Sequence, residues 1–339
     1  MKIKIGKKII GDDMPPYIVA EIGINHEGNF NKCKELLVSA KKAGSDAVKL
    51  QTLNPEENYI PNSKSYKLFE ISQLSNLEIK KVFAFAKKIN LDIFSTSGDK
   101  ETVDYIDKLN PCAHKISSGL LTHLPLIKYT AKKGKPLIIS TGMGSKKEIM
   151  KAVKTAIETG NKKIVLLHCV SMYPTNHKNL NLKTIIWLKK NFKHLIGYSD
   201  HSTSIEIPSF ASVLGACMVE KHFTLDINKK GFDHKISFNE KKFKQMTELI
   251  RLSFLTLGTE EKKLTLSEQK NKIKYRRYIV ANENIKKGSI LRKSNISIKR
   301  VLNGINGLEP AMIDKLYGRK SLKNIKKNKL IKKKFINLR

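Results

Sequence analysis

One pattern of hydrophobic and polar positions repeats from Tyr17 to about Gly258: a short β-rich run, a polar turn, and then an amphipathic helical pattern. Eight β-rich runs occupy residues 17–23, 46–52, 91–97, 113–119, 136–142, 163–169, 194–200 and 217–223. Helical patterns lie between them, and several end at glycine, as helix C-caps do. Eight such units predict an α/β protein of the (β/α)8 TIM-barrel type. A doubly wound sheet is the alternative, but the sequence lacks the Gly-rich nucleotide motif of that fold.

The segments outside this repeat have different patterns. Residues 1–16 alternate around a turn at Gly6-Lys7, which predicts a hairpin that caps the N-terminal end of the barrel at 17–258. Residues 259–275 are charged and lack a convincing apolar face, so we interpret them as a linker. Residues 276–339 contain short β-rich runs and turns, and they predict a small β-rich second domain.

The chain is strongly basic, with a formal net charge of +35 at pH 7. Residues 276–339 hold 19 Lys and Arg against three acidic residues, and their lysine-rich end is either a basic arm or solvated surface. Such a charge raises the question of nucleic-acid binding. The lysines are nevertheless spread over the whole chain, without the interleaved aromatic residues that stack on bases. The pattern therefore does not favour a nucleic-acid partner, whereas a positive field would steer a small acidic substrate.

The lengths of the hydrophobic runs and the spacing of the cysteines indicate the cellular compartment of the protein. No stretch approaches the roughly 20 apolar residues of a membrane span, and the N-terminus is not a secretory signal. The four cysteines stand far apart and form no CxxC pair. We therefore expect a cytoplasmic protein with reduced thiols and no membrane contact.

Polar side chains end all eight β-rich runs, where the strands of a TIM barrel converge on one site. The strand-end residues are Glu21, Lys49, Gln51, Thr96, Lys115, Ser118, Ser140, Tyr173, Ser199, Asp200, His201, Glu220, Lys221 and His222. A polar residue at the start of a loop would account for any one of these positions, but it accounts poorly for all of them together. Two lysines among hydroxyls and the glycine-bearing turns SSG and STGMG predict a cradle for a phosphate and a carboxylate.

His201 and His222 follow the last two predicted strands, which are neighbours in a barrel. Imidazoles suit Mn, Fe, Co or Zn better than Mg or Ca. Two histidines would leave coordination positions for water or substrate, which Lewis-acid catalysis needs. The pair therefore predicts a catalytic metal site.

Several stretches through these residues resemble the sialic acid synthase family, which makes N-acetylneuraminate, N,N'-diacetyllegionaminate and related sugars. In the barrel region they include AEIGINHEGN (20–29), GKPLIISTGMG (134–144), GYSDHS (197–202) and GFDHKIS (231–237). Beyond it, RRYIVA, NIKKGS, KR-x-x-NGI and YGRK are similar to the family's C-terminal SAF (antifreeze-like, β-clip) domain. The resemblance covers nearly the full chain.

The resemblance implies a TIM barrel joined to an SAF domain in a domain-swapped homodimer. It implies that phosphoenolpyruvate condenses with an N-acetylmannosamine-like amino-sugar aldehyde, giving a nine-carbon 2-keto acid and phosphate. The positions that match phosphoenolpyruvate contacts are Lys49, Thr96, Lys115, Ser118, Ser140 and Ser199. Those that match sugar contacts are Gln51, Tyr173, Asp233 and Arg300, the last from the partner's SAF domain. His201 and His222 match the metal ligands, with Mn²⁺ the usual activator, and Glu21 and Glu220 match acidic residues at the reacting centre.

Departures from the family pattern fall where the sugar's substituents would be contacted. STSGD replaces the usual STPFD, GLLTHL replaces G-E-x-T-N-L, SFNEKKF replaces an SLEPxEF-like segment, and KRVLNGI lacks the Pro-Gly that follows the arginine. The sugar is therefore left open, although GYSDH and GFDHK are closer to the neuraminic and legionaminic branches than to the pseudaminic one. Two alternatives stay open: a synthase that uses a phosphorylated sugar aldehyde, and a non-catalytic sugar- or nucleic-acid-binding protein.

Overall fold

The computed structural model describes residues 1–337 of the chain, and these residues divide into two compact units. The first unit runs from Met1 to Gly258, and the second begins at Thr259. Within the described residues, no helix is long and apolar enough to cross a membrane.

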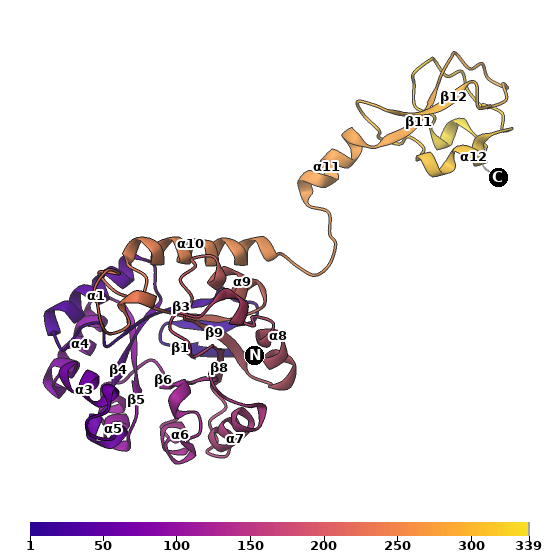
Figure 1. Cartoon of the computed structure of the whole chain (residues 1–339). Helices are drawn as coiled ribbons and strands as arrows, with labels where there is room; N and C mark the ends of the chain where they lie inside the picture. Colours follow the sequence, from indigo (N-terminus) through magenta and orange to yellow (C-terminus); the bar gives the residue numbers. More distant parts are fainter. Residues whose placement is uncertain (338–339) are drawn as a thin grey trace. The chain divides into compact units, whose positions relative to one another are not determined.

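The first unit is a closed barrel of eight parallel strands surrounded by helices, as the sequence pattern predicts (Figure 1). The strands pair in the order β10-β3-β4-β5-β6-β7-β8-β9. Their bounds are β3 (Tyr17–Gly23), β4 (Ala47–Thr52), β5 (Asp92–Ser97), β6 (His114–Ile116), β7 (Leu137–Ser140), β8 (Ile164–His168), β9 (Leu195–Asp200) and β10 (Met218–His222). Nearly all strand residues are buried, because helices cover one face of each strand and the barrel interior the other.

The outer layer consists of helices, most of which begin at a polar capping residue. The bounds are α1 (Phe30–Lys42), α2 (Pro55–Asn58), α3 (Lys64–Ile71), α4 (Asn76–Lys88), α5 (Lys100–Lys108), α6 (Leu124–Ala131), α7 (Lys146–Ile157), α8 (Thr184–Asn191), α9 (Ile207–Val213) and α10 (Glu240–Leu257). Ser75 and Ser145 form capping boxes at α4 and α7, and Asp99 caps α5. Their buried faces pack against the strands in two hydrophobic clusters, one on each side of the barrel.

A hairpin of β1 (Lys2–Ile5) and β2 (Lys8–Gly11) precedes the barrel. Its buried Ile3, Ile5 and Ile10 belong to one cluster with Val19, Phe94 and other interior residues near the strand starts. The hairpin therefore closes the N-terminal end of the barrel, which leaves the opposite end for the site.

The second unit begins with a helix in the segment that we interpreted as a linker. Helix α11 (Leu266–Tyr275) starts at a capping box of Thr265 and Glu268 and buries no residue. The lack of buried residues agrees with the absence of an apolar face in the sequence, and the capping box supports the helix without a packed face.

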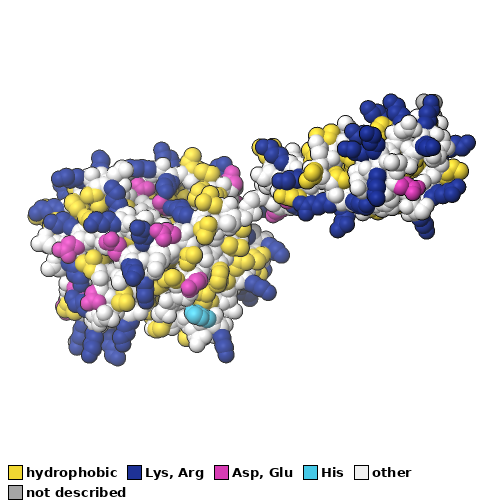
Figure 2. All heavy atoms as spheres, turned by 90° about the horizontal axis from the view of Figure 1, so that it is seen from above, with side chains coloured by type: hydrophobic (Ala, Val, Ile, Leu, Met, Phe, Trp, Pro, Cys, Tyr) yellow, Lys and Arg dark blue, Asp and Glu magenta, His cyan; other side chains and the backbone are white. Residues whose placement is uncertain are grey.

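The remainder of this unit is the small β-rich domain that the sequence predicts. It contains β11 (Arg277–Ala281), β12 (Ile296–Arg300) and α12 (Ile313–Leu316), around a core that includes Ile279, Leu291 and Ile331. β11 and β12 pair antiparallel. The lysine-rich segment is not a free arm up to residue 337, because Ile325, Ile331 and Ile336 bury it in this core. Its lysines are surface residues, like the Lys and Arg side chains spread over the visible faces of both units (Figure 2).

Candidate active site

Strand alternation decides which strand-end residues face the barrel interior. On β9 and β10, Ser199 pairs with Glu220, and Asp200 pairs with Lys221. The first pair joins the site, since Ser199 Oγ donates to Glu220 Oε1 over 3.0 Å. Successive residues of a strand point to opposite faces, so the second pair faces the helix layer.

Asp200 and Lys221 form a fully buried ion pair, with Nζ 2.8 Å from Oδ2. Asp200 also accepts from Tyr198 and Ser202, and the Lys221 ammonium lies 4.3 Å from the centre of the Phe238 ring. Because all of these partners belong to the protein, we interpret the pair as structural support for β9 and β10 behind the site.

Two lysines and two glutamates form the centre of the site. Glu220 Oε1 lies 3.0 Å from the Nζ atoms of both Lys49 and Lys115, and Lys115 also donates to Oε2 over 3.1 Å. Lys49 Nζ lies 2.6 Å from Glu21 Oε2, and Gln51 Nε2 donates to Glu21 Oε1 over 3.0 Å. The strands that carry the lysines, β4 and β6, are separated by β5, so Glu220 joins them across the barrel interior.

Burial and mutual charge set the protonation of this cluster. Burial lowers the pKa of Lys49 to about 7 and the Lys115 charge adds to the effect, although Glu220 opposes it. Burial alone would raise the pKa of Glu220, but Lys115 and Lys49 outweigh it and hold that pKa well below its usual range. Glu220 is therefore an ionised carboxylate that lies between the two lysines.

Hydroxyls and a glycine amide complete a cradle beside the lysines. Ser118 Oγ accepts from Gly142 N over 3.2 Å and lies 3.1 Å from Cys169 Sγ. A Cβ at Gly142 would lie 2.4 Å from Ser171 Oγ, so only glycine lets these groups approach. Thr96 Oγ1 and Ser171 Oγ are buried without a hydrogen-bond partner among residues 1–337. Unsatisfied buried hydroxyls are uncommon, and these two indicate a place for ligand acceptors.

The histidine pair lies beside this cradle. The rings of His201 and His222 are 5.5 Å apart between centroids, and the Tyr173 ring packs 4.3 Å from that of His201. His201 Nδ1 donates to Val170 O over 2.7 Å, which leaves Nε2 with a free lone pair. His222 Nδ1 is buried without a hydrogen-bond partner in the described structure, 3.5 Å from Asp233 Oδ2.

These imidazoles fit a metal site of incomplete protein coordination. Burial lowers the pKa of His201 to about 4 and that of His222 well below its usual value, so both rings are neutral, as metal ligands must be. Residues 1–337 contain no group of three or more His, Cys, Asp or Glu side chains arranged to hold a metal. The donor set is thus two nitrogens, and further ligands would come from water or substrate.

The structure brings the predicted barrel residues together at one end and leaves one predicted residue in the other unit. Ser140, buried at the end of β7, belongs to the group in the barrel. Arg300 lies at the end of β12, where its guanidinium stacks 4.4 Å from the centre of the Tyr275 ring. Sequence reasoning did not single out Gly142, Ser171 or Cys169, although the STGMG turn was a signal for the first.

The altered STSGD loop closes one side of the mouth. Asp99 accepts from Thr102 N over 2.7 Å and from Asn58 Nδ2 over 3.2 Å, so it links α5 to the segment after β4. A Cβ at Gly98 would lie 1.8 Å from Asn58 Oδ1 and 2.6 Å from Leu53 Cδ2. Glycine at position 98 therefore lets this segment pack closely against Asn58 and Leu53. A cleft of about 390 Å³ beside it is lined by Gln51 but by neither lysine and neither metal-site histidine.

Two family models and several known proteins match this chain. Residues 36–262 match the NeuB family, and residues 276–337 match the SAF domain. An uncharacterized protein of Methanocaldococcus jannaschii is 44% identical, covering 90% of each chain. N,N'-diacetyllegionaminic acid synthase of Campylobacter jejuni is 38% identical over 93% of this chain and 98% of its own.

Further relatives differ in the product that their names state. N-acetylneuraminate-9-phosphate synthase of Drosophila melanogaster is 32% identical over 84% of this chain and 86% of its own. A crystal structure of N-acetylneuraminic acid synthetase from Leptospira borgpetersenii has a TM-score of 0.77 at 32% identity, covering 80% of this chain and 95% of that one. The relatives that are named as synthases share sugar-acid synthesis and differ in the sugar acid.

Proposed function

The chain belongs to the NeuB family of sugar-acid synthases, and from that membership and its site we propose that it condenses phosphoenolpyruvate with an N-acetylmannosamine-like amino-sugar aldehyde. The products are a nine-carbon 2-keto acid and phosphate. The observation that carries this proposal is the pair of buried lysines beside unpartnered hydroxyls, next to two neutral histidines.

The cradle suits the two anionic groups of phosphoenolpyruvate. Lys49 and Lys115 supply positive charge, and the hydroxyls of Thr96, Ser118, Ser140 and Ser199 supply directional hydrogen bonds. The Gly142 N–H donates to Ser118 Oγ and so fixes that hydroxyl in the cradle. Because Glu220 holds both lysines, an entering anion competes with this carboxylate for the two ammonium groups.

A divalent cation, for which Mn²⁺ is our proposal, would be held by His201 and His222 and would polarise the aldehyde oxygen of the sugar. Asp233 and Gln51 lie at the histidine side of the centre, where they would bind sugar hydroxyl or amide groups. Tyr173, which packs on His201, forms another side of that region.

The reaction forms one carbon–carbon bond and breaks one carbon–oxygen bond. The methylene carbon of phosphoenolpyruvate attacks the aldehyde carbon, which leaves positive character on the phosphate-bearing carbon. Water adds to that carbon and loses a proton, while the former aldehyde oxygen gains one to become a hydroxyl. The tetrahedral intermediate then expels phosphate, and the proton of its new hydroxyl goes to the departing phosphate as the ketone forms. The protein has to orient the two substrates and accept the proton of the water.

We assign the proton to Glu21 rather than to Glu220. Glu220 accepts hydrogen bonds from Lys115 and Ser199 and pairs with Lys49, so its lone pairs are engaged. Glu21 accepts one bond from Gln51, and its Oε2 contacts Lys49 without hydrogen-bond geometry. A base needs a free lone pair directed at its proton, and Glu21 offers the better one.

The resemblance also leads us to propose a homodimer in which Arg300 of one copy reaches the sugar site of the other. Arg300 ends the exposed edge of β12, and Leu302 just beyond it is 96% exposed. A mixture of the Arg300→Ala and His201→Ala variants tests this arrangement. Shared sites would regain activity that neither variant has alone, and no recovery in mixed dimers would contradict it.

The experiment that tests the function measures phosphate release from phosphoenolpyruvate with Mn²⁺. The panel contains N-acetylmannosamine, its 2,4-diacetamido-trideoxy analogue and N-acetylmannosamine 6-phosphate. Release with one unphosphorylated sugar, lost on chelation and in His201→Ala, supports the proposal and names the substrate. Release only with the phosphorylated sugar favours the alternative that the Drosophila relative suggests. If folded protein releases no phosphate with any sugar of the panel, the result would contradict the proposal and favour a non-catalytic binding protein.

A further inference from the structure

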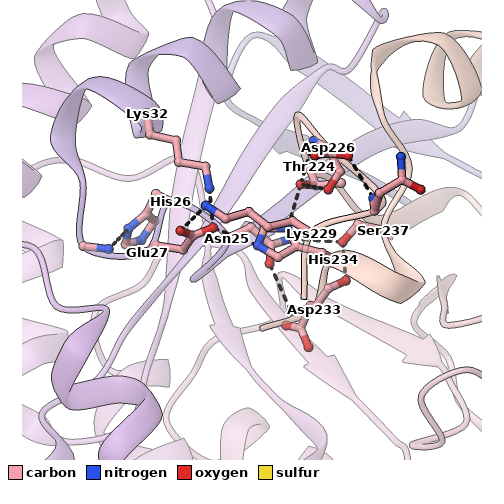
Figure 3. A network of polar contacts seen from close by, with 12 residues as sticks. Asn25, His26, Glu27, Lys32, Thr224, Asp226, Lys229, Asp233, His234 and Ser237 are labelled. Atoms are coloured by element: carbon pink, nitrogen blue, oxygen red, sulfur yellow. Dashed lines mark hydrogen bonds and ion pairs between the residues drawn. The ribbon is translucent and has the colours of Figure 1, made fainter. Parts of the chain in front are cut away.

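The turn after β3 and the segment after β10 are joined by a buried polar network (Figure 3). The turn covers residues 24–29, and the segment covers residues 223–238. Each follows a strand that carries a residue of the site, Glu21 on β3 and His222 on β10, and the two strands are neighbours in the barrel. The geometry of one loop therefore depends on the other.

Asn25 is the centre of this network. Its side chain is fully buried, and Nδ2 donates to Phe223 O over 2.9 Å and to Ser237 Oγ over 3.0 Å. Its Oδ1 accepts from Asp233 N over 3.1 Å. One amide side chain thus connects the beginning, middle and end of the segment after β10.

Asp233 is held by its backbone on both sides. Its N–H donates to Asn25, and its carbonyl oxygen accepts from Ser237 Oγ over 2.6 Å. The Asp233 carboxylate has no such support, and it points to the site, with Oδ2 3.5 Å from His222 Nδ1. The position of this carboxylate is therefore set by the backbone contacts that Asn25 and Ser237 make.

A second set of contacts fixes the other side of the segment. Fully buried His234 contacts Glu27 Oε1 through Nε2 at 2.9 Å and Thr224 Oγ1 through Nδ1 at 2.8 Å. Lys32 and Lys229 pair with the same Glu27 carboxylate. These contacts anchor the segment without involving Asp233, whose backbone is bonded to the side chains of Asn25 and Ser237 and to the Ile236 N–H.

We propose that Asn25 is a positioning residue for the sugar half of the site, and that it acts by fixing the Asp233 backbone through its own amide and through Ser237. This inference rests on the proposed function, in which Asp233 contacts the sugar and the lysine cradle binds phosphoenolpyruvate. Asn25 makes no contact with the lysines, so its loss affects one substrate and spares the other. A residue that only stabilised the barrel would affect both.

The test compares Asn25→Ala and Ser237→Ala with two matched controls. Asn161, at the opposite end of the barrel, is also a buried asparagine with two hydrogen bonds from Nδ2 and one to Oδ1. Ser209 on α9 resembles Ser237 in donating to a nearby backbone carbonyl over 2.6 Å. Asn161→Ala and Ser209→Ala should therefore cost similar stability without touching Asp233.

Two measurements are made on each variant of the full-length chain. Steady-state phosphate release gives KM for the sugar and for phosphoenolpyruvate, and deuterium exchange without substrate follows the amides of residues 224–238. We expect Asn25→Ala and Ser237→Ala to raise KM for the sugar about tenfold, to change KM for phosphoenolpyruvate less than about twofold, and to speed exchange in 224–238 about tenfold. The controls should show neither effect. Because Ser237→Ala is the milder change, it keeps the test valid if Asn25→Ala fails to fold.

The outcomes separate this inference from the proposed function. Equal changes in both KM values, or exchange in 224–238 no faster than in the controls, would overturn the positioning role. If the wild type releases no phosphate with any sugar but the two variants still speed exchange in 224–238, the proposed function fails and the fixing of Asp233 stands.

Discussion

The Glu220→Gln substitution tests whether the carboxylate between the two lysines holds the site together without ligand. Glutamine keeps the shape of the side chain and removes its charge. At 3.0 Å, each of the Glu220 contacts with Lys49 and Lys115 is worth roughly 5 kcal/mol of Coulomb attraction at an effective dielectric constant of about 20. Desolvation offsets much of this attraction, and breaking a buried pair costs about 3–5 kcal/mol net. We expect Glu220→Gln to lower the free energy of unfolding by that amount.

Phosphoenolpyruvate should reverse part of this loss. A ligand at 100 times its Kd stabilises a protein by about 2.7 kcal/mol. In the variant, Lys115 has lost its carboxylate partner and Lys49 keeps only Glu21, so at the same concentration the anion should stabilise Glu220→Gln more than the wild type.

Urea unfolding followed by the fluorescence of Trp187 measures both effects. Trp187 is the sole tryptophan of the chain, and it lies on α8 in the barrel, packed edge-on against Phe192. Glu148→Gln is the control, because Glu148 serves an exposed capping box on α7 that glutamine can also form. A loss below about 1 kcal/mol in Glu220→Gln, or equal stabilisation of variant and wild type by phosphoenolpyruvate, would refute the reasoning.

Four further predictions concern single residues of the barrel unit. Glu21→Gln should lower kcat about 10²–10⁴-fold with little change in KM for phosphoenolpyruvate, as phosphate release would show. His201→Ala should abolish Mn²⁺ binding in calorimetric titration, and binding equal to the wild type would contradict the metal site. Lys221→Met should cost about 3–5 kcal/mol in urea unfolding, because it leaves the Asp200 carboxylate buried and unpaired. Burial would raise the pKa of Glu27, but the hydrogen bonds from Lys229, Lys32 and His234 outweigh it and lower that pKa to about 2. Ionised Glu27 therefore stabilises the folded protein fully above the unfolded pKa, and this contribution is lost as the pH falls through about 2. The stability gap between wild type and Glu27→Gln should therefore narrow between about pH 5 and pH 2.

The barrel could be predicted from the sequence because each strand is a short buried run between polar turns. The prediction for β3 matches its observed bounds, residues 17–23. The run at 113–119 was predicted too long, since β6 ends at Ile116 and Ser118 begins a 3-10 turn toward the cradle. The local pattern therefore locates this strand, but it does not show where the strand gives way to the 3-10 turn.

The site was only partly predictable, because position at a strand end does not fix direction. Asp200 and Lys221 stood among the strand-end polar residues, yet they face the helix layer, one residue away from Ser199 and Glu220. Successive side chains of a strand point to opposite faces, so the register between β9 and β10 determines which of these residues face the site. The contact of Glu220 with Lys115 spans 105 positions of the chain, and no local pattern encodes such a contact.

Under the proposed function, the position of Glu220 explains how a site that binds anions would also release them. Two ammonium groups buried without a counterion would bind an anion tightly and would also slow the departure of phosphate and the keto acid. Each anion that enters must instead take Lys49 and Lys115 from Glu220, and each product that leaves returns the lysines to it. Binding is then an exchange of ion pairs, whose net free energy is far smaller than the gross attraction. Glu220→Gln should accordingly hold phosphate more tightly than the wild type, with a slower kcat if product release becomes limiting.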